Sequence, residues 1–174
     1  MKVLVSAASK HGATAEVAQE IGSTLREALN APRGDGEGAT VVEVLPPEQV
    51  DSVEPYDAVV LGSAVYAGHW LEGAKDLAKD HAEALTERAT WLFSVGPIGE
   101  PPKPDEEPVD VASIQEATKA SDHHIFPGKL DKNALGFAEK AIVLALRAPE
   151  GDFRDWDAIR GWAREIAVGL RQSH

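Results

Sequence analysis

The 174-residue sequence contains no cysteine. Disulfides, thiolate nucleophiles and cysteine-ligated iron–sulfur clusters are therefore excluded from its chemistry. Basic residues are also scarce, because 17 lysines and arginines stand against 29 aspartates and glutamates, for a formal net charge of −12. Nucleic acids and anionic lipid surfaces attract positively charged proteins. We therefore expect no nucleic-acid partner and no adsorption to an acidic membrane.

Long hydrophobic runs are missing as well. No apolar stretch approaches the roughly 20 residues that a membrane-spanning helix requires. Met1-Lys2 leads directly into a short apolar run, which is shorter than the apolar segment of a signal peptide. We expect a cytoplasmic protein without an integral membrane segment. Its length, its 43% hydrophobic residues and the absence of repeats favour a single domain spanning residues 1–174.

What the chain does contain is an alternation of short apolar runs and amphipathic segments. The apolar runs are typical of strands buried on both faces of a parallel sheet, with helices covering each face. We therefore expect an α/β three-layer sandwich with five parallel strands, and Asp155 is placed to cap the last helix. The expected strands are 2–5, 40–45, 56–61, 90–95 and 122–126, and the expected helices are 12–30, 70–85, 109–120, 131–147 and 156–171.

Ligands in such folds bind beside the carboxyl ends of the strands. The loop after the first strand reads SAASKHGAT and supplies the hydroxyls of Ser6, Ser9 and Thr14 at the start of a helix. Free backbone N–H groups at a helix start favour a phosphate, and Lys10 and His11 would add positive charge. A capped turn without a ligand is the alternative interpretation.

Competing phosphate-binding motifs are absent. The sequence has no G-x-x-x-x-G-K-[ST] and no G-x-G-x-x-G in its first turn. The third strand ends in Leu61-Gly62-Ser63 and not in an aspartate, which argues against a phospho-receiver domain. A cysteine-based phosphatase is impossible without cysteine.

The loops after the third and fourth strands favour a planar ring next to that phosphate. The first of them, GSAVYAGHW, carries Tyr66, His69 and Trp70, and the second spans Ser94–Gly99. Tyr66 lies within the loop itself, whereas Trp70 also fits the core stripe of the following helix. A planar ring with a phosphate tail would contact the first two loops together, and polar backbone groups of the third could bond the edge of the ring.

With these segments, the chain resembles the flavodoxin-like family, because LVSAASKHGATAEVAQEI is similar to its FMN-phosphate loop and first helix. The resemblance extends to the menaquinone-dependent protoporphyrinogen oxidase branch through YDAVVLGSAVYAGHW, WLFSVGPIGEPPKP and DWDAIRGWAREIA. It implies strand order 2-1-3-4-5, FMN as cofactor, and a porphyrinogen, a quinone or a redox protein as partner. The cofactor-binding residues that it implies are Ser9, Lys10, His11, Gly12, Ala13, Thr14, Ser63, Ala64, Val65, Tyr66, Ser94, Val95, Gly96 and Gly99.

Histidines offer two further hypotheses. His69 is the side chain near the expected ring that could move a proton, although a hydrogen-bonded histidine at a helix start is the alternative. His123 and His124 are adjacent in an expected strand and should point to opposite faces, so they cannot chelate one metal ion together. We expect no metal site.

Three functions therefore remain open. The chain could be an FMN-dependent oxidoreductase acting on a porphyrinogen or quinone, as its overall likeness favours. It could instead be an electron carrier, which its acidic composition favours. The third possibility is a flavodoxin-like scaffold without FMN or with another ligand, because Ala7, Ala8 and Ala13 dilute the hydroxyls of the first loop.

Overall fold

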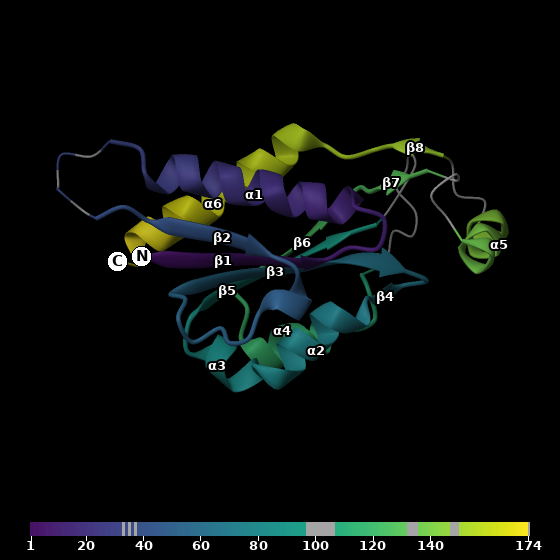
Figure 1. Cartoon of the computed structure of the whole chain (residues 1–174), viewed down its shortest axis with the longest axis horizontal. Coiled ribbons are helices and arrows are strands. Elements are labelled where there is room, and N and C mark those ends of the chain that lie inside the picture. Colours follow the sequence, from purple (N-terminus) through teal and green to yellow (C-terminus); the bar gives the residue numbers. More distant parts are fainter. Residues whose placement is uncertain are drawn as a thin grey trace.

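A computed structural model describes residues 1–32, 34, 36, 38–96, 107–131, 136–146 and 150–173. A parallel sheet lies at its centre, with strands in the order β2-β1-β3-β5-β6 (Figure 1). Counted along the chain, these are the first to fifth parallel strands in the order 2-1-3-4-5, so the predicted α/β sandwich is confirmed. The strands are β1 (Lys2–Ala8), β2 (Val41–Leu45), β3 (Ala58–Tyr66), β5 (Ala89–Val95) and β6 (His123–Phe126).

Helices cover both faces of this sheet. Figure 1 shows α1 (Ala13–Leu29) and α6 (Trp156–Gln172) on one side, and α2 (Glu72–Asp80), α3 (Ala82–Thr86) and α4 (Val111–Thr118) on the other. The sheet thus separates two apolar cores, one beneath α1 and α6 and one beneath α2, α3 and α4. A short 3-10 helix, η1 (Pro47–Gln49), follows β2.

The amphipathic patterns explain why these helices form where they do. Val17, Ile21 and Leu25 recur every four residues along α1 and are fully buried against the sheet. Asp155 caps α6 as predicted, because its Oδ1 accepts a hydrogen bond from the Ala158 N–H at 3.0 Å.

The third strand and its continuation differ from the prediction. β3 extends to Tyr66 and turns through Ala67 and Gly68, whose φ angles of 49° and 79° suit a two-residue hairpin. The chain then returns antiparallel as β4 (His69–Trp70). The predicted helix 70–85 is wrong at its start for this reason, and it divides into α2 and α3 at His81.

The segment before α6 also differs from the prediction. Within the described residues, the expected helix 131–147 begins later, because Asp131 and Gly136 are not helical and α5 spans Phe137–Leu146. Ahead of it, β7 (Lys129–Leu130) pairs antiparallel with β8 (Gly151–Asp152), which brings the entry to α6 next to the start of α1. Figure 1 shows α5 outside the two helical layers. In the part of the chain that the structure describes, no helix combines the length and apolarity needed to cross a bilayer.

Candidate functional site

The connection between β1 and α1 has the geometry of an anion site. Ser9 Oγ accepts a hydrogen bond from the Gly12 N–H at 3.1 Å, and Gly12 adopts a left-handed φ of 90° at the N-cap of α1. Gly12 has no side chain to cap the helix, so the N–H groups of the first turn receive no N-cap side-chain acceptor. Thr14 is buried in that turn. Hydroxyls, open helix N–H groups and the side chains of Lys10 and His11 form a donor set that fits a phosphate.

Lys10 and His11 already hold an anion in this structure, the carboxylate of Glu139 from the first turn of α5. Lys10 Nζ lies 2.8 Å from Glu139 Oε1, and His11 Nε2 lies 2.6 Å from Glu139 Oε2. Partial burial acts to raise the pKa of Glu139, but the bonds and charges of His11 and Lys10 outweigh it and hold this pKa below its ordinary value. The carboxylate therefore marks where this loop attracts negative charge.

Tyr66 connects this anion site to the β3–β4 hairpin. The ring of His11 meets the Tyr66 ring edge-to-face at 6.3 Å between centroids, and Lys10 Nζ lies 5.4 Å from the centre of the same ring. Burial and the nearby Glu139 carboxylate raise the pKa of Tyr66 to about 12. The phenol is therefore a neutral hydrogen-bonding group at neutral pH.

Ser63, Ala64 and Val65 lie at the end of β3 and not in a loop. Ser63 is fully buried, and its Oγ donates to the Ala64 carbonyl at 2.7 Å while accepting from the Leu71 N–H at 2.9 Å. Ala64 is buried as well, whereas Val65 and Tyr66 are partly exposed. Ser63 thus ties the start of α2 to the hairpin, and Val65 and Tyr66 are the side chains within reach of a ligand.

The end of β5 contributes the third segment. Ser94 Oγ accepts a hydrogen bond from Trp70 Nε1 at 2.8 Å and lies 2.8 Å from His123 Nε2, so both this hydroxyl and Trp70 are committed inside the core. Val95 is buried, and the Gly96 N–H donates to the Phe126 carbonyl at 3.2 Å. A Cβ at Gly96 would lie 2.7 Å from Val65 Cβ, so glycine lets this segment approach the hairpin. Gly99 lies outside the described residues.

The two adjacent histidines point to opposite faces of the sheet, as predicted. His123 faces Ser94 and places Nδ1 3.6 Å from Glu107 Oε1. Burial lowers the pKa of His123 despite the opposing effect of the Glu107 carboxylate. His124 instead packs against Phe126, at 4.5 Å between ring centroids. The described residues contain no group of three or more metal-ligating side chains.

His69 stands opposite Tyr66 in the β3–β4 pair, so the two side chains share one face of the hairpin. Its Nδ1 lies 3.2 Å from Asp110 Oδ2, and the same oxygen accepts from the Trp70 N–H at 3.0 Å. The Val109 N–H also donates to the Gly68 carbonyl at 2.8 Å. Asp110 is therefore fixed to the hairpin and can hold the His69 imidazole through Nδ1. About half of the His69 side chain is exposed, which leaves its Nε2 available for a proton transfer.

Sequence reasoning missed Asp110, Glu139 and Arg154. Arg154 Nη1 donates to the Ala13 carbonyl at 3.2 Å, and the guanidinium pairs with Glu16 and Asp152 at 2.9 and 2.8 Å. All three lie at least 40 residues from their partners in this site, except for the local Arg154–Asp152 pair. No local spacing signals such contacts, because only the fold brings the segments together.

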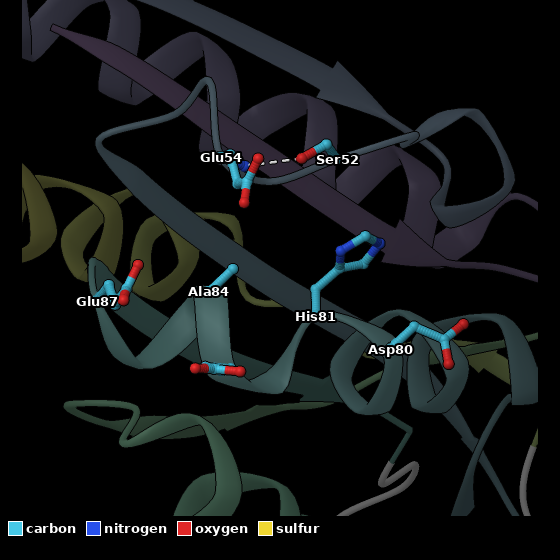
Figure 2. Close-up of a pocket in the computed structure, with 7 residues that line it drawn as sticks. Ser52, Glu54, Asp80, His81, Ala84 and Glu87 are labelled. Atoms are coloured by element: carbon cyan, nitrogen blue, oxygen red, sulfur yellow. Dashed lines mark hydrogen bonds between the residues drawn. The ribbon is translucent and has the colours of Figure 1, made fainter.

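A hollow of about 440 Å³ lies elsewhere (Figure 2). Its walls come from the segment that precedes β3, from the end of α2, from α3 and from the residue after α3. These segments lie at or near the amino ends of β3 and β5, whereas the anion site lies at the carboxyl end of β1. The hollow is thus separate from the candidate site, and its lining is mostly acidic: Ser52, Glu54, Asp80, His81, Glu83, Ala84 and Glu87.

Solved flavodoxins share this architecture. A flavodoxin from the domain Archaea matches with a TM-score of 0.61 and 16% identity, covering 98% of this chain and 99% of that chain. A short-chain flavodoxin associated with a non-canonical PDU bacterial microcompartment matches with a TM-score of 0.62 and 17% identity, covering 99% and 98%. At these identities, the likeness establishes the fold.

Two sequence matches also extend over most of this chain. Protoporphyrinogen IX dehydrogenase [quinone] of Escherichia coli strain K12 is 24% identical over 180 aligned residues, covering 96% of this chain and 95% of that protein. The family model described as Flavodoxin domain matches residues 4–157, which include most of β1, all of α1, the hairpin and the entry to α6. The chain therefore belongs to the flavodoxin-domain family.

Proposed function

We propose that this chain is an FMN-dependent oxidoreductase in which residues 1–174 form one flavodoxin-like domain. The observation that supports this most strongly is the loop between β1 and α1, where Lys10 and His11 hold an anion beside the Tyr66 ring. A flavin mononucleotide requires a helix start that can bind its phosphate and an aromatic ring nearby. Membership in the flavodoxin-domain family makes a flavin the fitting ligand.

The proposed contacts divide by chemistry. The phosphate would be held by the residues of the loop and first helical turn: Ser9, Lys10, His11, Gly12, Ala13 and Thr14. Val65, Tyr66 and Gly96 would border the ring, while Ser63, Ala64, Ser94 and Val95 set the shape of the hairpin and the end of β5 from inside the core. Gly99 remains a proposed contact from the sequence.

The flavin would supply the electron and hydride chemistry, and the protein would orient it and control protons. We propose His69 as the group that moves a proton, because its Nε2 is available while Asp110 holds Nδ1. Asp110 acts through His69 and is a positioning residue. A neutral Tyr66 adds a hydroxyl on the same face of the hairpin.

A porphyrinogen or a quinone is the proposed substrate class. This finer proposal draws on the likeness to the Escherichia coli protoporphyrinogen IX dehydrogenase [quinone] across 96% of this chain. Both substrates carry planar, largely apolar rings, so they suit packing against an exposed flavin ring.

Flavin binding tests the proposal directly. The purified chain is incubated with FMN or riboflavin, unbound ligand is removed, and the retained visible absorbance and fluorescence are recorded. We expect retention of FMN with quenched fluorescence, and weaker retention of riboflavin because it lacks the phosphate. A chain that retains neither flavin would contradict the proposal.

An electron carrier is the second candidate, favoured by the net charge of −12, which suits docking to a basic redox partner. Potentiometric titration of the FMN-loaded chain separates the two. Two well-separated one-electron steps would favour the carrier. A single two-electron step, with turnover of a quinone, would favour the oxidoreductase.

A further inference from the structure

Helix α5 contacts the candidate phosphate loop through the side chain of Glu139. Glu139 lies in its first turn and places one carboxylate oxygen on Lys10 and the other on His11, at 2.8 and 2.6 Å. Only 13% of the Glu139 side chain is exposed, although the helix lies outside the two helical layers (Figure 1). Phe137 and Leu144 of the same helix are 92% and 80% exposed. The contact of Glu139 with the loop therefore joins an outlying helix to the site.

A ligand phosphate at this loop would need the same two side chains. Lys10 and His11 are the basic side chains that the loop itself carries, and the Glu139 carboxylate contacts both. Arg154 also reaches the start of α1, but its guanidinium is matched by Asp152 and Glu16 and is nearly buried. A phosphate and this carboxylate are both negatively charged and repel each other strongly at such close range, so they compete for the loop.

We propose that Glu139 is an internal anion that occupies the phosphate position of the β1–α1 loop, and that a phosphate-bearing ligand displaces it and releases α5. The inference rests on the proposed flavin function for the identity of that ligand. Molecules in which Glu139 holds the loop cannot bind the phosphate, so the apparent ligand affinity falls as the fraction of such molecules rises. By reciprocity, phosphate binding loosens the attachment of α5.

Replacing Glu139 by glutamine tests the competition. E139Q removes the charge but keeps the shape, and E116Q removes the same charge from an exposed position of α4 on the other face of the sheet. We expect E139Q to bind FMN roughly tenfold more tightly than the unmodified chain, because two charge-assisted contacts no longer oppose the phosphate. Riboflavin affinity should be the same in E139Q and in the unmodified chain. E116Q should bind FMN as tightly as the unmodified chain does.

Amide hydrogen exchange supplies a second measurement on the unmodified chain. FMN should speed exchange of the α5 amides, residues 137–146, whereas riboflavin should leave it unchanged. FMN binding to E139Q that is equal to or weaker than binding to the unmodified chain would overturn the inference while leaving the flavin function intact. Unchanged α5 exchange on FMN binding would overturn it as well.

Failure of flavin binding would be a separate result. Inorganic phosphate is then the probe, and the imidazole resonances of His11 are followed by NMR during its titration. A lower midpoint concentration of phosphate in E139Q than in the unmodified chain would support the inference even without a flavin. Equal midpoints, or no response of His11 to phosphate in either chain, would overturn it.

Discussion

At the scale of single residues, Tyr66 shows how a side chain takes its properties from distant segments. It lies at the end of β3, yet its surroundings include His11 and Lys10 from the first loop and the charge of Glu139 from α5. Its place at the carboxyl edge of the sheet follows from the sequence, because the chain after the third strand must reach that edge. Its raised pKa does not, since this comes first from burial in the folded chain and then from a carboxylate 73 residues away in the sequence.

Alkaline titration tests this environment of Tyr66. Its pKa is raised to about 12, first by burial and then by Glu139, so its ionisation should be absent near pH 10 and appear near 12. A folded pKa above the unfolded one stabilises the protein below pH 10, and this stabilisation disappears as the pH rises through the folded value. Ultraviolet absorbance of tyrosinate in Y56F isolates Tyr66 from the other tyrosine.

Of the two causes that raise the pKa of Tyr66, the charge of Glu139 is the smaller. In an E139Q/Y56F chain, the Tyr66 pKa should fall but stay above 10, because burial persists. A Tyr66 that ionises near pH 10 in the Y56F chain would contradict the buried, acid-flanked placement.

The His69–Asp110 pair carries the second prediction at this scale. H69A should lower quinone turnover by the FMN-loaded chain by about 10²-fold or more if His69 is the proton carrier. D110N should lower it less and allow both imidazole tautomers, because a carboxylate accepts from Nδ1–H whereas an amide can also donate. Nitrogen NMR shifts of His69 report the tautomer. H81A, which alters a histidine of the acidic hollow, is the matched control. Turnover of H69A equal to that of the unmodified chain at every pH would exclude His69 as the proton carrier.

At the scale of elements, α1 packs on β2 through a glycine. A Cβ at Gly22 would lie 2.3 Å from Val44 Cγ2, and valine is restricted at χ1 and cannot swing away freely. The helical period predicts the buried face of α1 from Val17, Ile21 and Leu25. It does not predict that the helix approaches the sheet this closely at Gly22, because that distance depends on which side chain of β2 lies opposite.

Two helical glycines therefore make a matched pair. G22A should lower the free energy of unfolding by about 1–2 kcal/mol, because overpacking exceeds the gain in helix propensity. G161A lies in α6 with nothing within 4 Å of its added Cβ. That substitution should raise the free energy of unfolding by about 0.5–1 kcal/mol. Urea denaturation of both variants measures the difference, and equal effects of the same sign would contradict the packing at Gly22.

The β3–β4 hairpin is the element that local patterns describe worst. Trp70 fits a helical stripe with Ala74, Leu77 and Ala78, and all four are indeed buried. The structure places Trp70 in β4 all the same, because the turn at Ala67 and Gly68 returns the chain onto β3. Burial follows from hydrophobicity in either geometry, so the sequence predicts that Trp70 is buried without deciding whether it is in a helix or a strand.

At the scale of the whole molecule, paired carboxylates offset the effect of a net charge of −12. The pKa values of Glu43, Glu139 and Asp152 lie below their ordinary values of 4.5, 4.5 and 3.8. A hydrogen bond from Tyr56 dominates at Glu43 and one from Arg154 at Asp152. At Glu139, the bonds and charges of His11 and Lys10 overcome the effect of burial.

These carboxylates predict loss of stability in acid. A group whose pKa is lowered by folding stabilises the protein above its unfolded pKa, and the stabilisation disappears as the pH falls through the folded value. The free energy of unfolding should therefore be maintained above pH 4.5 and decline below it. Urea denaturation at a series of pH values measures this. A free energy of unfolding that stays constant or rises between pH 4.5 and 3 would contradict the pairing.

The sequence by itself determined the alternation of strands and helices, the apolar faces of α1 and α6, and the cap at Asp155. Those features depend on neighbours within a few positions, where hydrophobic period and capping act. The tertiary structure alone decided that Glu139 meets Lys10 and His11, that Asp110 holds His69, and that the hydroxyls of Ser63 and Ser94 are committed inside the core. These contacts depend on the strand order of the sheet and on the pairing of β7 with β8. No local pattern in the sequence predicts either feature.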